Sequence, residues 1–259
     1  MTDYVFPFGQ PVTSCAKPVA TQHDWFVLGA YPSALHVAWT PPEGTSSPVA
    51  RIAAIPVDNE PEPFWDGHDE TDRIEAWKTA VGFADKWGQV SPVGKLNGSS
   101  GAWVREQVMD KFGFSRKDAV VTDCLDSYFA SIDGARALTE RFAPFAAAHN
   151  VEGGRLPAHP SEGQIVAIAT AQHGERLVEE LAAAAPRYVI TLGNAALRVM
   201  RNTVMSLVES PKSLNTHPGL YGKSIPIALG DHQMAWFPLA HPAAPKQYQG
   251  VHKMFRPRL

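Results

Sequence analysis

Short apolar runs that stop at glycine or at polar residues recur along this chain and predict the strands of a sheet. Three of them, Trp25–Gly29, Ala119–Thr122 and Tyr188–Leu192, are rich in β-branched and aromatic residues, and a fourth stretch spans Met234–Pro242. Gly193 ends the third run, and a helical pattern follows over Ala195–Met200. A strand, a turn and a helix in succession form the repeating unit of a parallel sheet.

Helical periodicity fills the intervals between these runs. In residues 71–87 the apolar side chains recur at helical spacing. Further helices are expected over Trp103–Phe112, within residues 134–149, and from Pro160 to about Ala184. Ser161 is expected to cap the last of them, because a glutamine follows at the position that completes a capping box.

The remaining segments are less regular. Val49–Val57 alternates in part and predicts another strand, whereas residues 33–39 form a short apolar segment ended by two prolines. Gly94–Gly101 is a loop rich in glycine and serine, and residues 1–24 form an irregular arm, because prolines oppose regular structure. The whole order predicts a single α/β domain over residues 1–259. It is a three-layer αβα sandwich with a central, mostly parallel sheet.

The ends of the predicted strands are the expected place for chemistry. Ligands of open parallel sheets bind at the carboxyl ends of the strands. We therefore expect one crevice to be lined by Gly29–Ser33, Thr122–Asp123, Gly193–Asn194 and His241–Pro242.

Composition narrows the kind of protein. Of the 259 residues, 44% are hydrophobic and 19% are charged, and the formal net charge is −3, so any nucleic-acid surface must be a local patch. No apolar run approaches the roughly 20 residues of a membrane span, and no signal-peptide pattern is present. We expect a cytoplasmic protein without a membrane partner. Cys15 and Cys124 are too few for a disulfide framework or a four-cysteine cluster.

A set of short motifs occurs in a fixed order along the chain. Gly29-Ala-Tyr-Pro-Ser33 has the form Gly-x-x-Pro, and Gly98-Ser-Ser-Gly101 precedes a helix, a glycine turn and Val121-Thr-Asp123. Pro186–Ala196 has the form Pro-x-x-Val-Ile-x-Leu-Gly-x-x-Ala, and Ala240-His-Pro-Ala243 resembles a late His-Pro-Ser motif. In order and spacing, over roughly residues 25–250, these motifs resemble those of the uracil-DNA glycosylase superfamily.

The resemblance implies a DNA glycosylase, a hydrolase that flips a base out of the duplex and cleaves its N-glycosidic bond, as in DNA repair by base excision. His241 then donates a hydrogen bond to the departing base, and Asp123 stands where the family has an amide that recognises the base edge. The implied base pocket comprises Gly29, Ala30, Tyr31, Pro32, Ser33, Thr122 and Asn194. The Ser-Gly loop adds the candidate DNA contacts Ser99 and Ser100.

The C-terminal tail offers further DNA contacts. It has no acidic residue from position 243 to 259. The candidates for phosphate contact are Lys246, Lys253 and Arg256.

The sequence departs from the family pattern in the first motif. Ala30 and Tyr31 stand where the family has an acid or amide that activates the attacking water. The acidic run over residues 58–70 offers substitutes. Asp66 is our candidate for this catalytic role, although spacing does not select it over Asp58, Glu60, Glu62 and Asp69.

The second departure is Asp123. An ionised carboxylate only accepts hydrogen bonds, which suits the amino group of cytosine better than O4 of uracil. A protonated Asp123, with its pKa raised by burial, mimics the amide instead.

Each of these residues also has an ordinary structural interpretation. Gly29 and Gly193 serve equally well as turn glycines, His241 as a buried core histidine, and Asp123 as the N-cap of a following helix. The acidic run is then a solvated loop, and the tail an ordinary basic terminus.

Three functions follow as alternatives. The first is a glycosylase acting on a uracil-type or modified base, such as one derived from cytosine. The second is a non-catalytic nucleic-acid-binding protein, and the third is a hydrolase of free nucleosides or nucleotides. We favour the first, with DNA as partner and a monomeric protein. We expect no metal and no cofactor, because the cysteines of the family's iron–sulfur branch are missing and no metal or dinucleotide motif appears.

Overall fold

The computed structural model describes residues 4–15, 22–44, 51–204 and 211–258. Contacts within the chain gather into two compact units, each described here by itself. Unit 1 contains Met1–Cys15, Ser33–Ser99 and Ser127–His159. Unit 2 contains Ala16–Pro32, Ser100–Asp126 and Pro160–Leu259. Both units are assembled from segments that are distant in the sequence. Folding as one domain over residues 1–259 stays a prediction.

Unit 2 is built on a five-stranded sheet in the order β5-β1-β6-β8-β7. Its strands are β1 (Trp25–Gly29), β5 (Ala119–Asp123), β6 (Tyr188–Leu192), β7 (Ile225–Leu229) and β8 (His232–Leu239). The first four in sheet order run parallel, and β7 pairs antiparallel with β8 at one edge. The predicted α/β architecture with a mostly parallel sheet is therefore confirmed, and the four predicted apolar runs form its parallel part.

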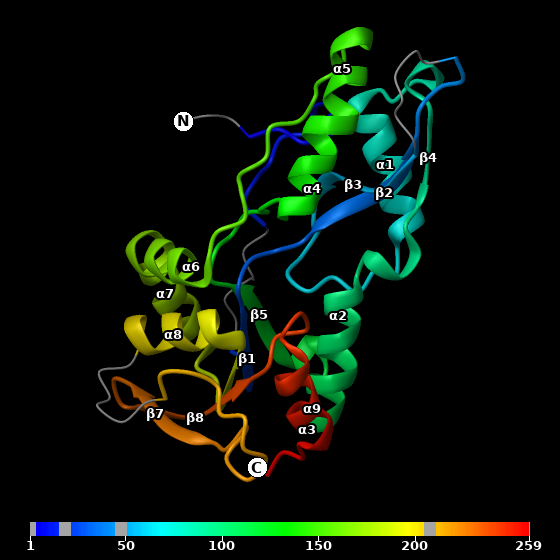
Figure 1. Cartoon of the computed structure of the whole chain (residues 1–259). Coiled ribbons are helices and arrows are strands. Elements are labelled where there is room, and N and C mark those ends of the chain that lie inside the picture. Colours follow the sequence, from blue (N-terminus) through cyan, green and yellow to red (C-terminus); the bar gives the residue numbers. More distant parts are fainter. Residues whose placement is uncertain (1–3, 16–21, 45–50, 205–210, 259) are drawn as a thin grey trace. The chain divides into compact units, whose positions relative to one another are not determined.

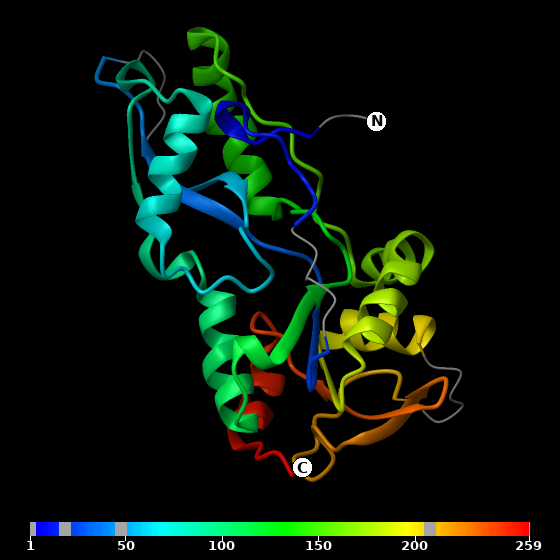
Figure 2. The ribbon, with the colours of Figure 1, turned by 180° about the vertical axis from the view of Figure 1, so that it is seen from behind.

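Helices cover both faces of this sheet (Figures 1 and 2). One layer consists of α6 (Glu162–Ile168), η7 (Ala169–His173), α7 (Gly174–Ala184) and α8 (Gly193–Thr203). The other contains one helix made of α2 (Ser99–Val104), η4 (Arg105–Met109) and α3 (Asp110–Phe112), together with α9 (Lys246–Met254). The short turn η5 (Arg116–Asp118) leads into β5. Burial on both faces explains why the parallel strands are apolar along most of their length.

Unit 1 contains a second sheet, in the order β3-β2-β4. Its strands β2 (Ala34–Thr40), β3 (Ile52–Asn59) and β4 (Gln89–Pro92) pair antiparallel. Its helices are α1 (Glu70–Val81), α4 (Ile132–Ala137), η6 (Leu138–Phe142) and α5 (Ala143–His149), with the short turns η1 (Pro7–Gly9), η2 (Asp85–Trp87) and η3 (Gly94–Leu96). The sequence predicted a strand near β3 but not this separate sheet.

Two predicted boundaries are wrong for local reasons. The helix expected over residues 71–87 stops at Val81, because Gly82 adopts a left-handed conformation with φ of 62° and caps the helix. The loop expected at residues 94–101 is shorter, because a helix already begins at Ser99. The predicted capping box is confirmed: Ser161 and Gln164 exchange hydrogen bonds of 2.8 and 3.3 Å.

The core of unit 1 is aromatic and includes the described part of the N-terminal arm. Phe8 is 5% exposed and lies against the rings of Trp39, Trp77 and Phe142. Residues 1–3 and 16–21 of the predicted arm, and the first two residues of the strand predicted over 49–57, lie outside the described residues. Among the helices that are described, none is long and apolar enough to cross a membrane.

Candidate functional site

Four strand ends of unit 2 meet at one edge of its sheet. The parallel register places Gly29 level with Asp123, and Leu192 level with Leu239. The carboxyl ends of β5, β1, β6 and β8 therefore lie side by side. The predicted site residues that emerge at this edge are Gly29, Ala30, Tyr31, Pro32, Asp123, Asn194 and His241. Ser33, the last residue of the first motif, belongs to unit 1.

Asp123 ends β5 with its carboxyl group buried. The residue is 4% exposed, and its Oδ1 atom has no hydrogen-bond partner among the described residues. Burial raises the pKa of Asp123 to about 7. The charges of Arg176 and Arg116 oppose this rise, and that of Glu180 adds to it. The neutral acid is therefore favoured up to neutral pH, and it is a donor as well as an acceptor.

An arginine of α7, whose side chain is 13% exposed, fixes the end of β5. Nη2 of Arg176 donates to the carbonyl oxygens of Asp123 and Cys124, at 2.7 and 3.1 Å. Nη1 donates to Oγ1 of Thr122 at 3.1 Å and to Glu180, one helical turn later, at 2.9 Å. Arg176 bonds the main chain of Asp123 and not its carboxyl group, so it positions Asp123 without pairing with that group. The charge of Arg176 is balanced by Glu180.

Sequence reasoning missed this buried ion pair. Glu180 lies on the face of α7 that also buries Leu177, Leu181 and Ala184, and Arg176 is placed four residues before it. A charged residue on an apolar helix face, with an opposite charge four positions away, is the signal that indicates a buried pair.

The first motif is tied to the same strand end. The N–H of Cys124 donates to the carbonyl oxygen of Gly29 at 3.1 Å, and the next N–H along the chain donates to that of Ala30 at 3.0 Å. Tyr31 is half-buried, and burial together with the nearby charge of Asp123 raises the pKa of its hydroxyl group. Tyr31 and Asp123 thus lie within electrostatic reach of one another.

His241 follows β8 and lies against the end of β6. A methyl group on Gly193 would lie 3.1 Å from Cβ of His241, so the two segments are in close contact. The N–H of Ala243 donates to Nδ1 of His241 at 3.1 Å. Because Nδ1 accepts, the neutral imidazole carries its hydrogen on Nε2. Burial lowers the pKa of His241 to about 4, which keeps the ring neutral at pH 7.

His217 lies in a second His-Pro turn, and comparison with it shows which features of His241 belong to the turn alone. Nδ1 of His217 accepts the N–H of Gly219 at 3.1 Å, which is the same local bond, but His217 is exposed. The bond to Nδ1 is therefore a property of the turn. Desolvation of the ring and placement at the sheet edge distinguish His241.

Two residues assigned to the base pocket make structural hydrogen bonds. Oδ1 of Asn194 accepts the N–H of Leu214 at 2.8 Å and so holds a later segment of the chain. The hydroxyl of Thr122, a residue that is 2% exposed, accepts from Arg176. Contact of either residue with a base stays a prediction.

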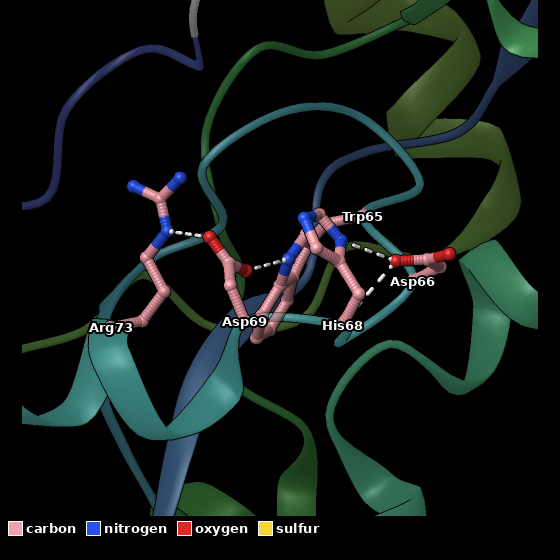
Figure 3. A network of polar contacts seen from close by, with 5 residues as sticks. All are labelled: Trp65, Asp66, His68, Asp69 and Arg73. Carbon is pink, nitrogen blue, oxygen red and sulfur yellow. Dashed lines mark hydrogen bonds and ion pairs between the residues drawn. The ribbon is translucent and has the colours of Figure 1, made fainter.

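Asp66 belongs to unit 1 and takes part in a local polar network (Figure 3). Its Oδ1 atom contacts Nδ1 of His68 at 2.7 Å and accepts the backbone N–H of the same residue at 3.2 Å. Asp69 accepts from Nε1 of Trp65 at 2.7 Å and from Nε of Arg73 at 2.9 Å. The hydrogen bond that His68 donates to the carboxylate of Asp66 raises the pKa of this exposed histidine. This part of the acidic run is thus ordered by contacts at the start of α1.

Another acid of the run lies at the first motif. Oε2 of Glu60 accepts the N–H of Ser33 at 2.8 Å, and Glu60 is 6% exposed. Pro32, next to Ser33 in the chain, is also buried. Glu60 therefore places a carboxylate on Ser33, the last residue of the first motif, a contact that spacing in the sequence did not reveal.

The Ser-Gly loop packs against the segment that carries Asp66. Gly98 has a φ of 75°, and a methyl group there would lie 2.1 Å from the carbonyl carbon of Asp66, so only glycine fits this contact between two backbones. Ser99 is exposed and opens α2, and the half-buried Ser100 follows it. Asp66 and Ser99, for which different roles are expected from the sequence, therefore lie on neighbouring segments.

The basic residues of the tail lie on and after α9. Lys246 and Lys253 are exposed. Nη1 of Arg256 donates to the carbonyl oxygens of Lys253 and Phe255, at 3.1 and 2.8 Å, and so stabilises the end of the helix. Contact of these three residues with phosphate stays a prediction, and Arg256 also has this structural role.

Two further observations concern metal ligands and a surface hollow of unit 2. The described residues include no group of three His, Cys, Asp or Glu side chains arranged to hold a metal ion. An open hollow lies at the opposite, amino edge of the unit 2 sheet and is lined by Gln22, His23, Asp24, Lys117, Asp118 and Ala185. Asp118 accepts from the hydroxyl of Ser115 at 2.6 Å in a helix cap, so its carboxylate has a structural role.

We expect Gly193→Ala to displace His241. The φ of Gly193 is 89°, and the added methyl group would meet Cβ of His241 at 3.1 Å. An alanine in this left-handed conformation costs about 1–2 kcal/mol. The free energy of unfolding should fall by about that amount, and the NMR signals of the His241 ring should shift.

Gly163→Ala is the control, because Gly163 has no atom within 4 Å of its added methyl group and no positive φ. It should leave the His241 signals in place. Unshifted His241 signals in Gly193→Ala would show that the two segments are not in contact.

Neither a model of a protein family nor a curated protein matches this chain.

Proposed function

We propose that this protein is a DNA glycosylase-like hydrolase that binds a flipped base at the carboxyl edge of the unit 2 sheet and cleaves its N-glycosidic bond. The observation that supports this most strongly is a pair of desolvated groups at that edge. Asp123 is an acid held neutral up to about pH 7, and His241 is an imidazole that stays neutral down to about pH 4. The finer fold assignment, a three-layer sandwich like that of uracil-DNA glycosylases, is part of the proposal and is supported by the order of the motifs.

The separation of the two groups suits a nucleobase. β5 and β6 are separated by β1 in the sheet. Neighbouring strands lie about 4.8 Å apart, so the ends of β5 and β6 are about 10 Å apart. Asp123 ends β5, and His241 contacts Gly193 at the end of β6. A pyrimidine ring placed between the two side chains can meet both of them.

A neutral His241 fits the role of donor to the departing base. Cleavage of the glycosidic bond puts negative charge on the base, and a hydrogen-bond donor aimed at that charge lowers the barrier. The Nε2–H of His241 is such a donor in the tautomer fixed by Ala243. Gly193, against which His241 packs, is the first residue of α8, and the positive end of a helix dipole also favours an anion.

The protonation state of Asp123 determines which base edge it fits. A neutral acid donates one hydrogen bond and accepts another, as an amide does, and so suits the O4 and N3–H of uracil. An ionised carboxylate only accepts and suits an exocyclic amino group. Because the pKa of Asp123 is raised to about 7, the form that suits uracil predominates below pH 7 and is lost as the pH rises further.

Activation of water requires an acceptor that Ala30 cannot supply. Asp66 and Glu60 both belong to unit 1, and activation of water by either acid stays a prediction. Glu60 is bonded to the N–H of Ser33 at the end of the first motif. Oδ1 of Asp66 is already engaged by His68. In this proposal Lys246 and Lys253 contact phosphates of the DNA backbone.

Release of bases from DNA tests the function directly. Purified protein is incubated with duplexes that carry uracil, hypoxanthine or modified cytosines, and released bases are identified by mass spectrometry. We expect release of at least one base. His241→Ala should slow that release by roughly 10²–10³-fold, the usual cost of losing one donor to a developing anion, with little change in melting temperature.

His217→Ala is the matched control, because His217 has the same turn and the same bond to Nδ1 but is exposed. It should keep the full rate. If the wild type releases no base from any duplex, the proposal of a DNA glycosylase is wrong. Salt-dependent DNA binding without release would then indicate a binding protein, and cleavage of free nucleosides would indicate the third function.

The pH dependence of uracil release tests the role of Asp123. We expect the wild-type rate to fall about tenfold per pH unit above pH 7, because the protonated acid declines in that proportion. Asp123→Asn carries an amide that does not titrate, so its rate should be nearly flat from about pH 6 to 9 and should exceed the wild-type rate at pH 8.

Asp133→Asn is the control for this experiment, because the side chain of Asp133 is 84% exposed. It should keep the wild-type pH profile. His241 adds no step in this range, since its pKa is lowered to about 4. A wild-type rate that is flat across the range, and unaffected by Asp123→Asn, would show that Asp123 does not recognise the base.

A further inference from the structure

The strand end that precedes His241 is held by a chain of buried hydrogen bonds. The N–H of Ala240 donates to the hydroxyl oxygen of Tyr221 at 2.6 Å, and that hydroxyl lies 2.8 Å from Nδ1 of His252. Nε2 of His252 lies 2.9 Å from the carbonyl oxygen of Gln107. Ala240, Tyr221 and His252 are 0%, 3% and 1% exposed, so these bonds are shielded from solvent.

Only one arrangement of hydrogens satisfies this chain. A carbonyl oxygen only accepts, so Nε2 of His252 carries its hydrogen and donates to Gln107. Nδ1 of the neutral ring is then an acceptor, so the hydroxyl of Tyr221 donates to it. The hydroxyl oxygen in turn accepts from Ala240. Burial lowers the pKa of His252 to about 4, which maintains this arrangement at ordinary pH.

A second contact from the same helix reaches His241 itself. Nε2 of Gln249 donates to the carbonyl oxygens of His241 and Pro242, both at 2.8 Å. α9 therefore holds the residue before His241 through His252 and Tyr221, and holds His241 through Gln249. Two attachments on one helix restrict both the position and the rotation of the segment that carries the imidazole.

Packing encloses the chain of hydrogen bonds on several sides. The ring of Trp103 lies 4.8 Å from that of His252, and the ring of Phe255 lies 5.5 Å from that of Tyr221. Nζ of Lys111 donates to the carbonyl oxygen of His252 at 2.9 Å. Because they are enclosed, Tyr221 and His252 do not contact a substrate, and their influence on a reaction must pass through His241.

We propose that Tyr221 and His252 are positioning residues for His241, with α9 as the frame that holds the imidazole in place. The inference rests on the proposed function of His241 as the donor to the departing base. A misplacement of about 1 Å at a reacting group can cost roughly 10²-fold in rate. Loss of this hydrogen-bond chain should therefore lower turnover much more than DNA binding.

Tyr221→Phe tests the proposal with little change in packing. The substitution removes one hydroxyl and leaves the N–H of Ala240 and Nδ1 of His252 without their partner. We expect base release to slow about 10–100-fold, as for other groups that orient a catalytic residue. Affinity for a duplex with an abasic-site analogue should stay within about twofold, because binding does not depend on this donor.

Two further variants define what His252 contributes. His252→Asn keeps an acceptor near the position of Nδ1 and should retain more activity than His252→Leu, which keeps none. Tyr248→Phe is the matched control, because it removes a hydroxyl from the same helix that has no hydrogen bond among the described residues. It should leave the rate unchanged.

A double-mutant cycle separates positioning from a general structural role. If Tyr221 acts through His241, Tyr221→Phe should cost about twofold or less once His241 is replaced by Ala. An equal loss in both backgrounds would overturn the proposal.

NMR of the histidine rings gives a readout that needs no activity. We expect the His241 ring signals to shift or broaden in Tyr221→Phe and to stay in place in Tyr248→Phe. If the wild type releases no base but His241 responds in this way, the proposed function fails and the positioning stands. His241 signals that are unchanged in Tyr221→Phe overturn the positioning, whatever the activity.

Discussion

The parallel, in-register pairing of β5, β1, β6 and β8 is the constraint on which the candidate site depends. Parallel strands all finish at one edge, so the pairing gathers Gly29, Asp123, Gly193 and His241, which together span more than two hundred residues of the sequence. Arg176 reinforces this edge by bonding the carbonyl groups at the end of β5. Asp123 is 4% exposed at this edge, and desolvation of Asp123 and of the His241 ring gives the edge its chemical character.

Desolvation raises the pKa of Asp123 and lowers the pKa of His241. Both shifts favour the uncharged form of the side chain. The pKa of Asp123 is raised to about 7 and that of His241 is lowered to about 4, so both side chains are neutral between about pH 4 and pH 7. The charge of Arg176, which bonds the end of β5, is balanced by Glu180 within α7. Such an edge suits an uncharged ligand that gains negative charge during reaction, because each neutral group still offers a donor.

Much of the fold of unit 2 could be predicted from the sequence, because its parallel strands are buried on both faces and appear as short apolar runs. Tyr188–Leu192 and Trp25–Gly29 are strands with the predicted bounds. The sheet of unit 1 could not be predicted in this way. Its strands are antiparallel, and β4 pairs with β2 across a stretch of chain that contains β3 and α1.

The candidate site was only partly predictable. The positions of Asp123 and His241 at the sheet edge could be predicted, because apolar runs mark where the strands end and parallel strands end at the same edge. The desolvation of Asp123 depends on side chains that pack over it, and the contact of Glu60 with Ser33 depends on a fold between residues 27 positions apart. Arg176, Tyr221 and His252 act through hydrogen bonds to distant backbone groups, for which short motifs give no signal.

Binding of a free base to the isotope-labelled protein tests the central claim most directly, because it needs neither DNA nor turnover. Uracil is added at millimolar concentration at pH 6, and the carboxyl signal of Asp123 and the ring signals of His241 are followed by NMR. If one base meets both residues, the two sets of signals should shift together along one saturation curve and give the same Kd. Saturable binding that leaves both residues unchanged, or that shifts only one of them, would contradict a shared base site at this edge of the sheet.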